Sequence, residues 1–139
     1  MHNGADTVSS KGEVRIEQIL RKEHIRFERE KTFKDLRGGL YRFDFYLTDL
    51  GVILEYQGMQ HYEYVKLFHK KRSDFTKAQG RDRRKISYCL AHKIPLYCIP
   101  FWELENLNTL NDLLKDEFLA RDKFHNDNVY RLQKSRIKT

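Results

Sequence analysis

Two carboxylates interrupt stretches of the chain that otherwise consist of apolar, aromatic and β-branched residues. Asp44 lies in the segment LYRFDFYL, and Glu55 lies in the segment GVILEY. Such segments are typical of β-strands with a buried face, where an unpaired carboxylate is unfavourable. The turn residues between them predict a hairpin centred on Asp49 and Leu50. The fold must therefore accommodate both charges.

Pairing alone predicts how the two acids are placed in this hairpin. If Leu47 pairs with Val52, then Asp44 faces Glu55 on the same side, with Cβ atoms about 4.5–5.5 Å apart. Gln57 projects from the same face as Glu55, because side chains alternate along a strand. Two buried carboxylates so placed repel unless they share a proton or hold a cation. A β-bulge in either strand would remove this pairing.

Oxygen ligands favour a hard cation at this position. Two carboxylates and a backbone carbonyl suit Mg²⁺ or Mn²⁺, which keep some water molecules for substrate phosphates. Such an ion could stabilise the attacking water or the leaving oxygen during phosphodiester hydrolysis. Asp44 alone is better explained by a surface position or an ion pair with Arg42. The two acids together favour the cation, because Glu55 interrupts the run VILEY.

Composition sets the class of protein. The 139 residues match the length of one domain, and 27 Lys and Arg against 20 acids give a net charge of +7. This charge favours a polyanionic partner, although a solvated basic surface explains it equally. No stretch resembles a membrane span or a signal peptide, so we expect a cytoplasmic protein. Cys89 and Cys98 lie in apolar contexts and are expected to be reduced and buried.

Periodicity predicts the secondary structure along the chain. Ser10 and Glu13 form a capping box that starts a helix, and RFEREKTF is a candidate edge strand. Residues 63–92 are expected to be largely helical and basic, and IPLYCIP to be a short buried strand. Leucines in FWELENLNTLNDLLKDEFL recur at helical spacing. This order predicts a small α/β or α+β domain.

Four motifs along the chain resemble those of a known nuclease superfamily. SKGE, RFDFYL, ILEYQGMQHY and RDRRKISYC are similar, in order and spacing, to motifs of the PD-(D/E)XK nucleases. The similarity is strongest to the branch of very-short-patch repair endonucleases and phage EDxHD homing endonucleases, and it extends from about Ser10 to about Trp102. It implies a restriction-endonuclease-like core, a small mixed sheet flanked by helices, that cleaves DNA with Mg²⁺ or Mn²⁺.

The resemblance also divides the chain and suggests its setting. It implies a Vsr-like nuclease domain at residues 10–120. Composition predicts a flexible tail at residues 1–9 and a basic C-terminal segment at residues 121–139, of which the final RLQKSRIKT is expected to be solvated. Enzymes of this type act in the cytoplasm of a bacterial or phage-infected cell.

The resemblance implies an active centre of Glu13, Asp44, His61 and Asp82. Glu55 falls where the wider superfamily has its second metal-binding carboxylate. Taken singly, each residue has a simpler explanation. Glu13 could serve only as a capping partner, His61 could be an exposed loop residue, and Asp82 could form a surface ion pair within its helix.

Position 57 departs from the superfamily pattern. The superfamily usually has a lysine there that orients or activates water, whereas the amide of Gln57 cannot take up a proton. The resemblance makes the carbonyl of Tyr56 an additional metal ligand. His61 is the natural substitute for the lysine, because an imidazole titrates near pH 6.5. Lys85, one helical turn after Asp82, could steady that aspartate or contact a phosphate.

A basic run between two of the motifs is expected to contact DNA phosphates. No DNA-reading module is recognisable, which leaves three alternatives. The chain could be the catalytic domain of a longer, homing-type endonuclease, a homodimer or a separate recognition module could supply specificity, or the enzyme could read a DNA structure such as a mismatch or junction. Two other functions remain open: a non-catalytic nucleic-acid-binding protein on the same fold, and cleavage of RNA. The candidate DNA-binding residues are Lys70, Lys71, Arg72, Lys77, Arg81, Arg83, Arg84 and Lys85.

Overall fold

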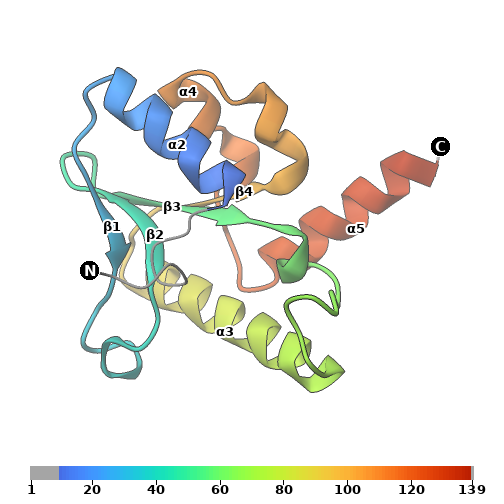
Figure 1. Ribbon diagram of the computed structural model, residues 1–139. Helices are drawn as coiled ribbons and strands as arrows, with labels where there is room; N and C mark the ends of the chain where they lie inside the picture. Colours follow the sequence, from blue (N-terminus) through green and yellow to red (C-terminus); the bar gives the residue numbers. More distant parts are fainter. Residues whose placement is uncertain (1–9, 139) are drawn as a thin grey trace.

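The chain folds into a mixed α+β domain in which helices flank one four-stranded sheet, as the sequence predicted (Figure 1). The computed structural model describes residues 10–138. The tail predicted at residues 1–9 therefore lies outside the described part of the chain. Among the described residues, no helix combines the length and the apolar character needed to cross a membrane.

The sheet contains the four predicted strands. These are β1 (Phe27–Lys31), β2 (Phe43–Leu47), β3 (Val52–Gln57) and β4 (Leu96–Pro100), and they lie in the order β1-β2-β3-β4. The first three strands are antiparallel, and β4 runs parallel to β3. RFEREKTF indeed supplies an edge strand, β1.

The hairpin between β2 and β3 has the predicted register. Leu47 pairs with Val52, and Phe45 pairs with Leu54. The chain reverses through residues 48–51, where Gly51 adopts a φ of 67° that side-chain-bearing residues rarely adopt. The register therefore brings Asp44 and Glu55 to the same level at the far end of the hairpin.

Helices cover both faces of the sheet. Apolar side chains of α2 (Lys11–Lys22) pack on one face, which α4 (Leu110–Leu113) also covers, and side chains of α3 (Arg72–Ala91) pack on the other (Figure 1). Cys89 and Cys98 are buried and free, as predicted. The first core contains Ile16, Ile19, Leu20, Phe45, Leu47, Leu54 and Ile99, and the second contains Phe43, Ile53, Ile86, Cys89, Leu96 and Cys98.

Three predicted segments differ from the structure. The helix predicted from residue 63 begins only at Arg72, because residues 64–69 form a loop in which His69 Nδ1 accepts a hydrogen bond from the Val65 N–H at 2.9 Å. The basic stretch RLQKSRIKT is solvated, as expected, because most of its described side chains are exposed, but it forms the end of a helix, α5 (His125–Lys138), which extends away from the domain (Figure 1).

The third difference is the predicted leucine-rich helix. It is broken into 3₁₀ turns at Phe101–Asn106 and Asp116–Phe118, with the short α4 between them. A capping box starts α4: Thr109 Oγ1 accepts from the Asp112 N–H at 3.4 Å, and Asp112 Oδ2 accepts from the Thr109 N–H at 2.9 Å. These local bonds compete with helix continuation, so leucine spacing alone gave the wrong element.

Candidate active site

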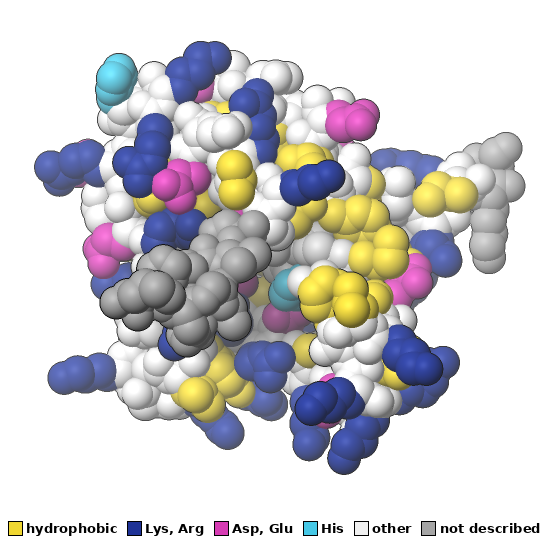
Figure 2. Space-filling view, viewed as in Figure 1, with side chains coloured by type: hydrophobic (Ala, Val, Ile, Leu, Met, Phe, Trp, Pro, Cys, Tyr) yellow, Lys and Arg dark blue, Asp and Glu magenta, His cyan; other side chains and the backbone are white. Residues whose placement is uncertain are grey.

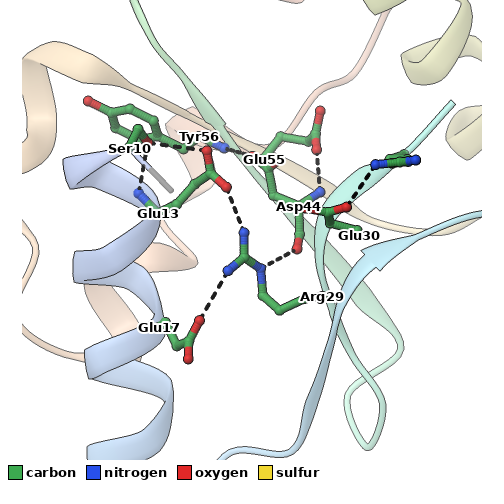
Figure 3. Close-up of polar contacts among 9 residues, drawn as sticks. Ser10, Glu13, Glu17, Arg29, Glu30, Asp44, Glu55 and Tyr56 are labelled. Atoms are coloured by element: carbon green, nitrogen blue, oxygen red, sulfur yellow. Dashed lines mark hydrogen bonds and ion pairs between the residues drawn. The ribbon is translucent and has the colours of Figure 1, made fainter. Parts of the chain in front are cut away.

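The two carboxylates singled out in the sequence meet where the β2–β3 hydrogen-bond ladder ends. The Asp44 N–H donates to Glu55 Oε2 at 2.6 Å, and the Tyr56 N–H donates to Asp44 Oδ2 at 2.8 Å (Figure 3). Each carboxylate thus accepts a hydrogen bond from the backbone of the opposite strand. Asp44 is partly exposed, whereas Glu55 is buried.

Helix α3 supplies a cation to this pair. Lys85 Nζ lies 2.6 Å from Glu55 Oε1, and the two side chains are only 12% and 5% exposed. Burial alone would lower the pKa of Lys85, but the carboxylates of Glu55 and Asp44 outweigh it and raise that pKa. Lys85 is therefore charged. Its partner is Glu55 and not Asp82, the partner that helical spacing suggested.

One lysine does not balance the negative charge around Asp44. Burial, and then the charges of Glu55 and Glu13, raise the pKa of Asp44 well above its ordinary value, although Lys85 and the Tyr56 N–H act in the opposite direction. An acid with a raised pKa favours either a proton or a nearby cation. The surroundings of Asp44 therefore carry too little positive charge to balance the carboxylates.

Glu13 reaches the site from the first turn of α2. Ser10 caps this helix as predicted, because its Oγ accepts a hydrogen bond from the Glu13 N–H at 3.2 Å. The Glu13 carboxylate makes its shortest contact outside the helix, with Arg29 Nη2 at 2.6 Å (Figure 3). Glu13 is therefore more than a capping partner.

His61 and Asp82 form a second polar pair. His61 ends the 3₁₀ turn Met59–His61 that follows β3, and its Nδ1 lies 2.9 Å from Asp82 Oδ2 on α3. The His61 side chain is 25% exposed and that of Asp82 is 11% exposed. A carboxylate on Nδ1 orients the ring and leaves Nε2 as the outward-facing nitrogen.

A cleft of about 470 Å³ opens beside His61 and Asp82, and Glu13, Asp44 and Glu55 are not among the residues that line it. It is lined by both members of the histidine–aspartate pair and by Lys85, with Lys77 and Arg81 alongside. Figure 2 shows a hollow on this face in which histidine and acidic side chains lie among Lys and Arg. The imidazole of His61, the carboxylate of Asp82 and three basic side chains thus line one opening.

Gln57, at the end of β3, leaves a buried oxygen without a partner. The residue is 2% exposed, and its Oε1 accepts no hydrogen bond from any described residue. A buried carbonyl oxygen is normally satisfied, so an unpaired one indicates a place for a water molecule or an ion. The neighbouring Tyr56 packs its ring against α2 at Gly12, where there is no room for a Cβ.

The donor set suits magnesium better than zinc. Among residues 10–138, no group of three or more His, Cys, Asp or Glu side chains is placed to hold a metal ion. Magnesium, however, is commonly bound through one or two carboxylates, with water and substrate oxygens completing its coordination. Asp44, Glu55 and a neutral oxygen of Gln57 or the Tyr56 backbone match that description.

The eight basic residues predicted to contact DNA fall into two groups. Three are engaged within the protein: Arg83 with Asp127 at 3.0 Å, Arg84 with the Tyr41 hydroxyl at 3.0 Å, and Lys85 with Glu55. The other five have exposed side chains before or along the N-terminal half of α3: Lys70, Lys71, Arg72, Lys77 and Arg81.

Arg29 is the site residue that the sequence analysis missed. Its segment, RFEREKTF, only indicated an edge strand. No local pattern identifies Arg29, because its contacts with Glu13 and Asp44 depend on how α2 packs over the sheet.

Two viral proteins are similar to part of the chain, and no protein-family model matches it. Uncharacterized protein 094L of Frog virus 3 (isolate Goorha) is 42% identical over 65 residues, which are 46% of this chain and 42% of that protein. Uncharacterized protein 307L of Invertebrate iridescent virus 6 is 34% identical over 58 residues, 42% of this chain and 29% of that protein. The matched segments thus span less than half of either relative.

Proposed function

We propose that the protein is a divalent-metal-dependent DNA endonuclease that hydrolyses phosphodiester bonds. The observation that carries this proposal is the meeting of Asp44 and Glu55 at the open end of the hairpin, with Lys85 between them and the cleft. Burial and the charge of Glu55 raise the pKa of Asp44, and carboxyl groups perturbed in this way concentrate at functional sites. The resemblance to PD-(D/E)XK nucleases supports the same chemistry.

Asp44 and Glu55, with the carbonyl of Tyr56, are the proposed ligands of Mg²⁺ or Mn²⁺. A bound ion would neutralise the charge that develops on the phosphate during hydrolysis. The free Oε1 of Gln57 can accept a hydrogen bond from a water molecule at the site. The Gln57 side chain would thus orient water without taking its proton.

His61 is the proposed acid–base group. With Nδ1 held by Asp82, its Nε2 is available to accept a proton from the attacking water or to donate one to the leaving oxygen. Asp82 would fix the orientation of the ring. Lys85, a cation that lines the cleft, would contribute the positive charge that the superfamily pattern usually places at position 57.

The exposed basic residues are the proposed contacts to the DNA backbone. Lys77 and Arg81 line the cleft, and Lys70, Lys71 and Arg72 continue the positive charge to the start of α3. Phosphate contacts of this kind position DNA without reading its sequence. Sequence or structure specificity would come from a homodimer, a separate recognition module or a mismatch or junction in the DNA.

A second candidate function, non-catalytic binding of nucleic acid, is favoured by two observations. Lys85 already occupies one oxygen of Glu55, and an amide stands at position 57 in place of a lysine. A protein of this kind would use the same basic surface and would bind DNA without cutting it.

Cleavage of supercoiled plasmid separates the two candidates. Wild type, Asp44→Asn and the exposed hairpin control Asp49→Asn are incubated with Mg²⁺, Mn²⁺ or a chelator, on plasmid and on mismatched and branched duplexes. We expect metal-dependent nicking or linearisation by wild type and Asp49→Asn, and none by Asp44→Asn. Binding of every substrate without cleavage of any would refute the nuclease proposal and support the binding protein.

A further inference from the structure

The backbone groups of Asp44 form hydrogen bonds with side chains of the two neighbouring strands and not with their backbones. On the β3 side, its N–H donates to the side chain of Glu55 and not to a ladder carbonyl. On the β1 side, the register places Glu30 opposite Asp44, yet the two residues are not paired although those on either side are. Glu30 has a φ of 52°, in the left-handed region that non-glycine residues rarely adopt. The β1–β2 pairing is thus interrupted at Asp44, and the β2–β3 pairing ends beside it.

The side chain of Arg29 fills the interruption on the β1 side. Its Nε donates to the carbonyl oxygen of Asp44 at 3.1 Å, where a ladder N–H would otherwise donate (Figure 3). The guanidinium carbon lies 4.4 Å from the centre of the Phe45 ring, which supports the group from below. The Asp44 carbonyl is therefore held by a side chain.

The same guanidinium also holds the acids of α2. Nη2 lies 2.6 Å from Glu13 Oε1, and Nη1 lies 3.1 Å from Glu17 Oε1. The Arg29 side chain is 25% exposed, so these contacts are partly shielded from water. One rigid, planar group thereby joins a helix to the strand residue at the centre of the proposed active site.

We propose that Arg29 is a positioning residue that sets Asp44 and Glu13 relative to one another. This inference rests on the proposed nuclease function. Arg29 acts through the two acids and does not touch the substrate. Arginine is suited to the task because its donors form a fixed fork, whereas a lysine ammonium is a point charge on a flexible stem. Small displacements of reacting groups lower rates strongly even when binding is retained.

The test is steady-state cleavage of a labelled DNA duplex by Arg29→Lys and Arg29→Gln. We expect kcat to fall about 10- to 100-fold in both variants, with KM changed by less than about threefold. Arg29→Lys keeps the positive charge but loses the fixed arrangement of guanidinium donors. A loss of kcat in this variant is therefore due to the donor geometry and not to the charge. The matched control is Arg26→Gln, because the ion pair of Arg26 with Asp49 is exposed and lies outside the contacts of Arg29. This variant should stay within about threefold of wild type.

Each other outcome overturns the inference. Full kcat in Arg29→Lys would show that charge suffices, while the nuclease proposal would stand. If wild type does not cut DNA, the nuclease proposal fails and this inference fails with it.

Folding is measured in parallel by circular dichroism. Variants that unfold are remade in the Glu30→Gly background, where glycine accepts the positive φ and should raise the Tm. Unfolding in that background as well would assign Arg29 a purely structural role.

Discussion

Replacing Lys85 by methionine removes the charge that faces Glu55 and keeps most of the side-chain volume. The two side chains are 12% and 5% exposed and their charged atoms are 2.6 Å apart, so Glu55 would be left as a buried, unpaired carboxylate. Breaking a buried pair in this way destabilises proteins by about 3–5 kcal/mol. The whole free energy of unfolding of such a domain is about 5–15 kcal/mol. The expected loss is therefore large but compatible with folding.

A double-mutant cycle separates this charge effect from lost packing. Glu55→Gln in the Lys85→Met background removes the unpaired charge, so we expect it to recover about 2–3 kcal/mol of the loss. Arg26→Met is the matched control, because its ion pair with Asp49 is 76% and 62% exposed and should contribute less than about 1 kcal/mol.

Urea unfolding at neutral pH measures the free energies of unfolding of wild type, Lys85→Met, Glu55→Gln and the double variant, and in the same way that of the Arg26→Met control. The fluorescence of the single tryptophan, Trp102, reports the transition, and an unchanged slope with urea confirms that the same surface is exposed in each variant. The reasoning would be refuted if Lys85→Met lost less than about 1 kcal/mol. It would also be refuted if Glu55→Gln destabilised Lys85→Met further.

Three further predictions concern stability. Because the pKa of Asp44 is raised in the folded protein, wild type should lose stability as pH rises above the ordinary pKa of an aspartate. Asp44→Asn removes this loss, so it should stabilise the metal-free protein more and more as pH rises. A difference in Tm between the variant and wild type that stays constant from pH 4 to 9 would contradict this. Burial lowers the pKa of His125, so stability should fall as pH drops below about 6.5, and His125→Gln should abolish that loss in urea titrations at pH 5 and 7. Gly12→Ala should cost about 1–3 kcal/mol, because its Cβ would overlap the Tyr56 ring; an unchanged Tm would show that the ring moves freely.

Local patterns predicted the framework of the site. The hairpin register followed from alternation and from a short turn, and both are set by neighbouring residues. It therefore placed Asp44 and Glu55 at one level. Ser10 was identifiable as a helix cap for the same reason, since the bond from the Glu13 N–H spans three residues.

Features that depend on packing between elements were not predictable. The partner of Lys85 is decided by how α3 crosses the sheet, so helical spacing suggested Asp82 where the structure has Glu55. Glu30 carries no signal for a positive φ, because that conformation is normally marked by glycine or asparagine. The role inferred for Arg29 depends on the unpaired position at Glu30, so it could not be predicted from the sequence either.

The most direct test of the proposed centre is the single-turnover rate of duplex cleavage with enzyme in excess, measured together with the dissociation constant for the same DNA. We predict that Asp44→Asn lowers the rate by at least about 10³-fold in Mg²⁺ or Mn²⁺, while the dissociation constant stays within about threefold of wild type. An Asp44→Asn variant that cleaves at the wild-type rate, or whose loss is explained entirely by weaker binding, would contradict the account.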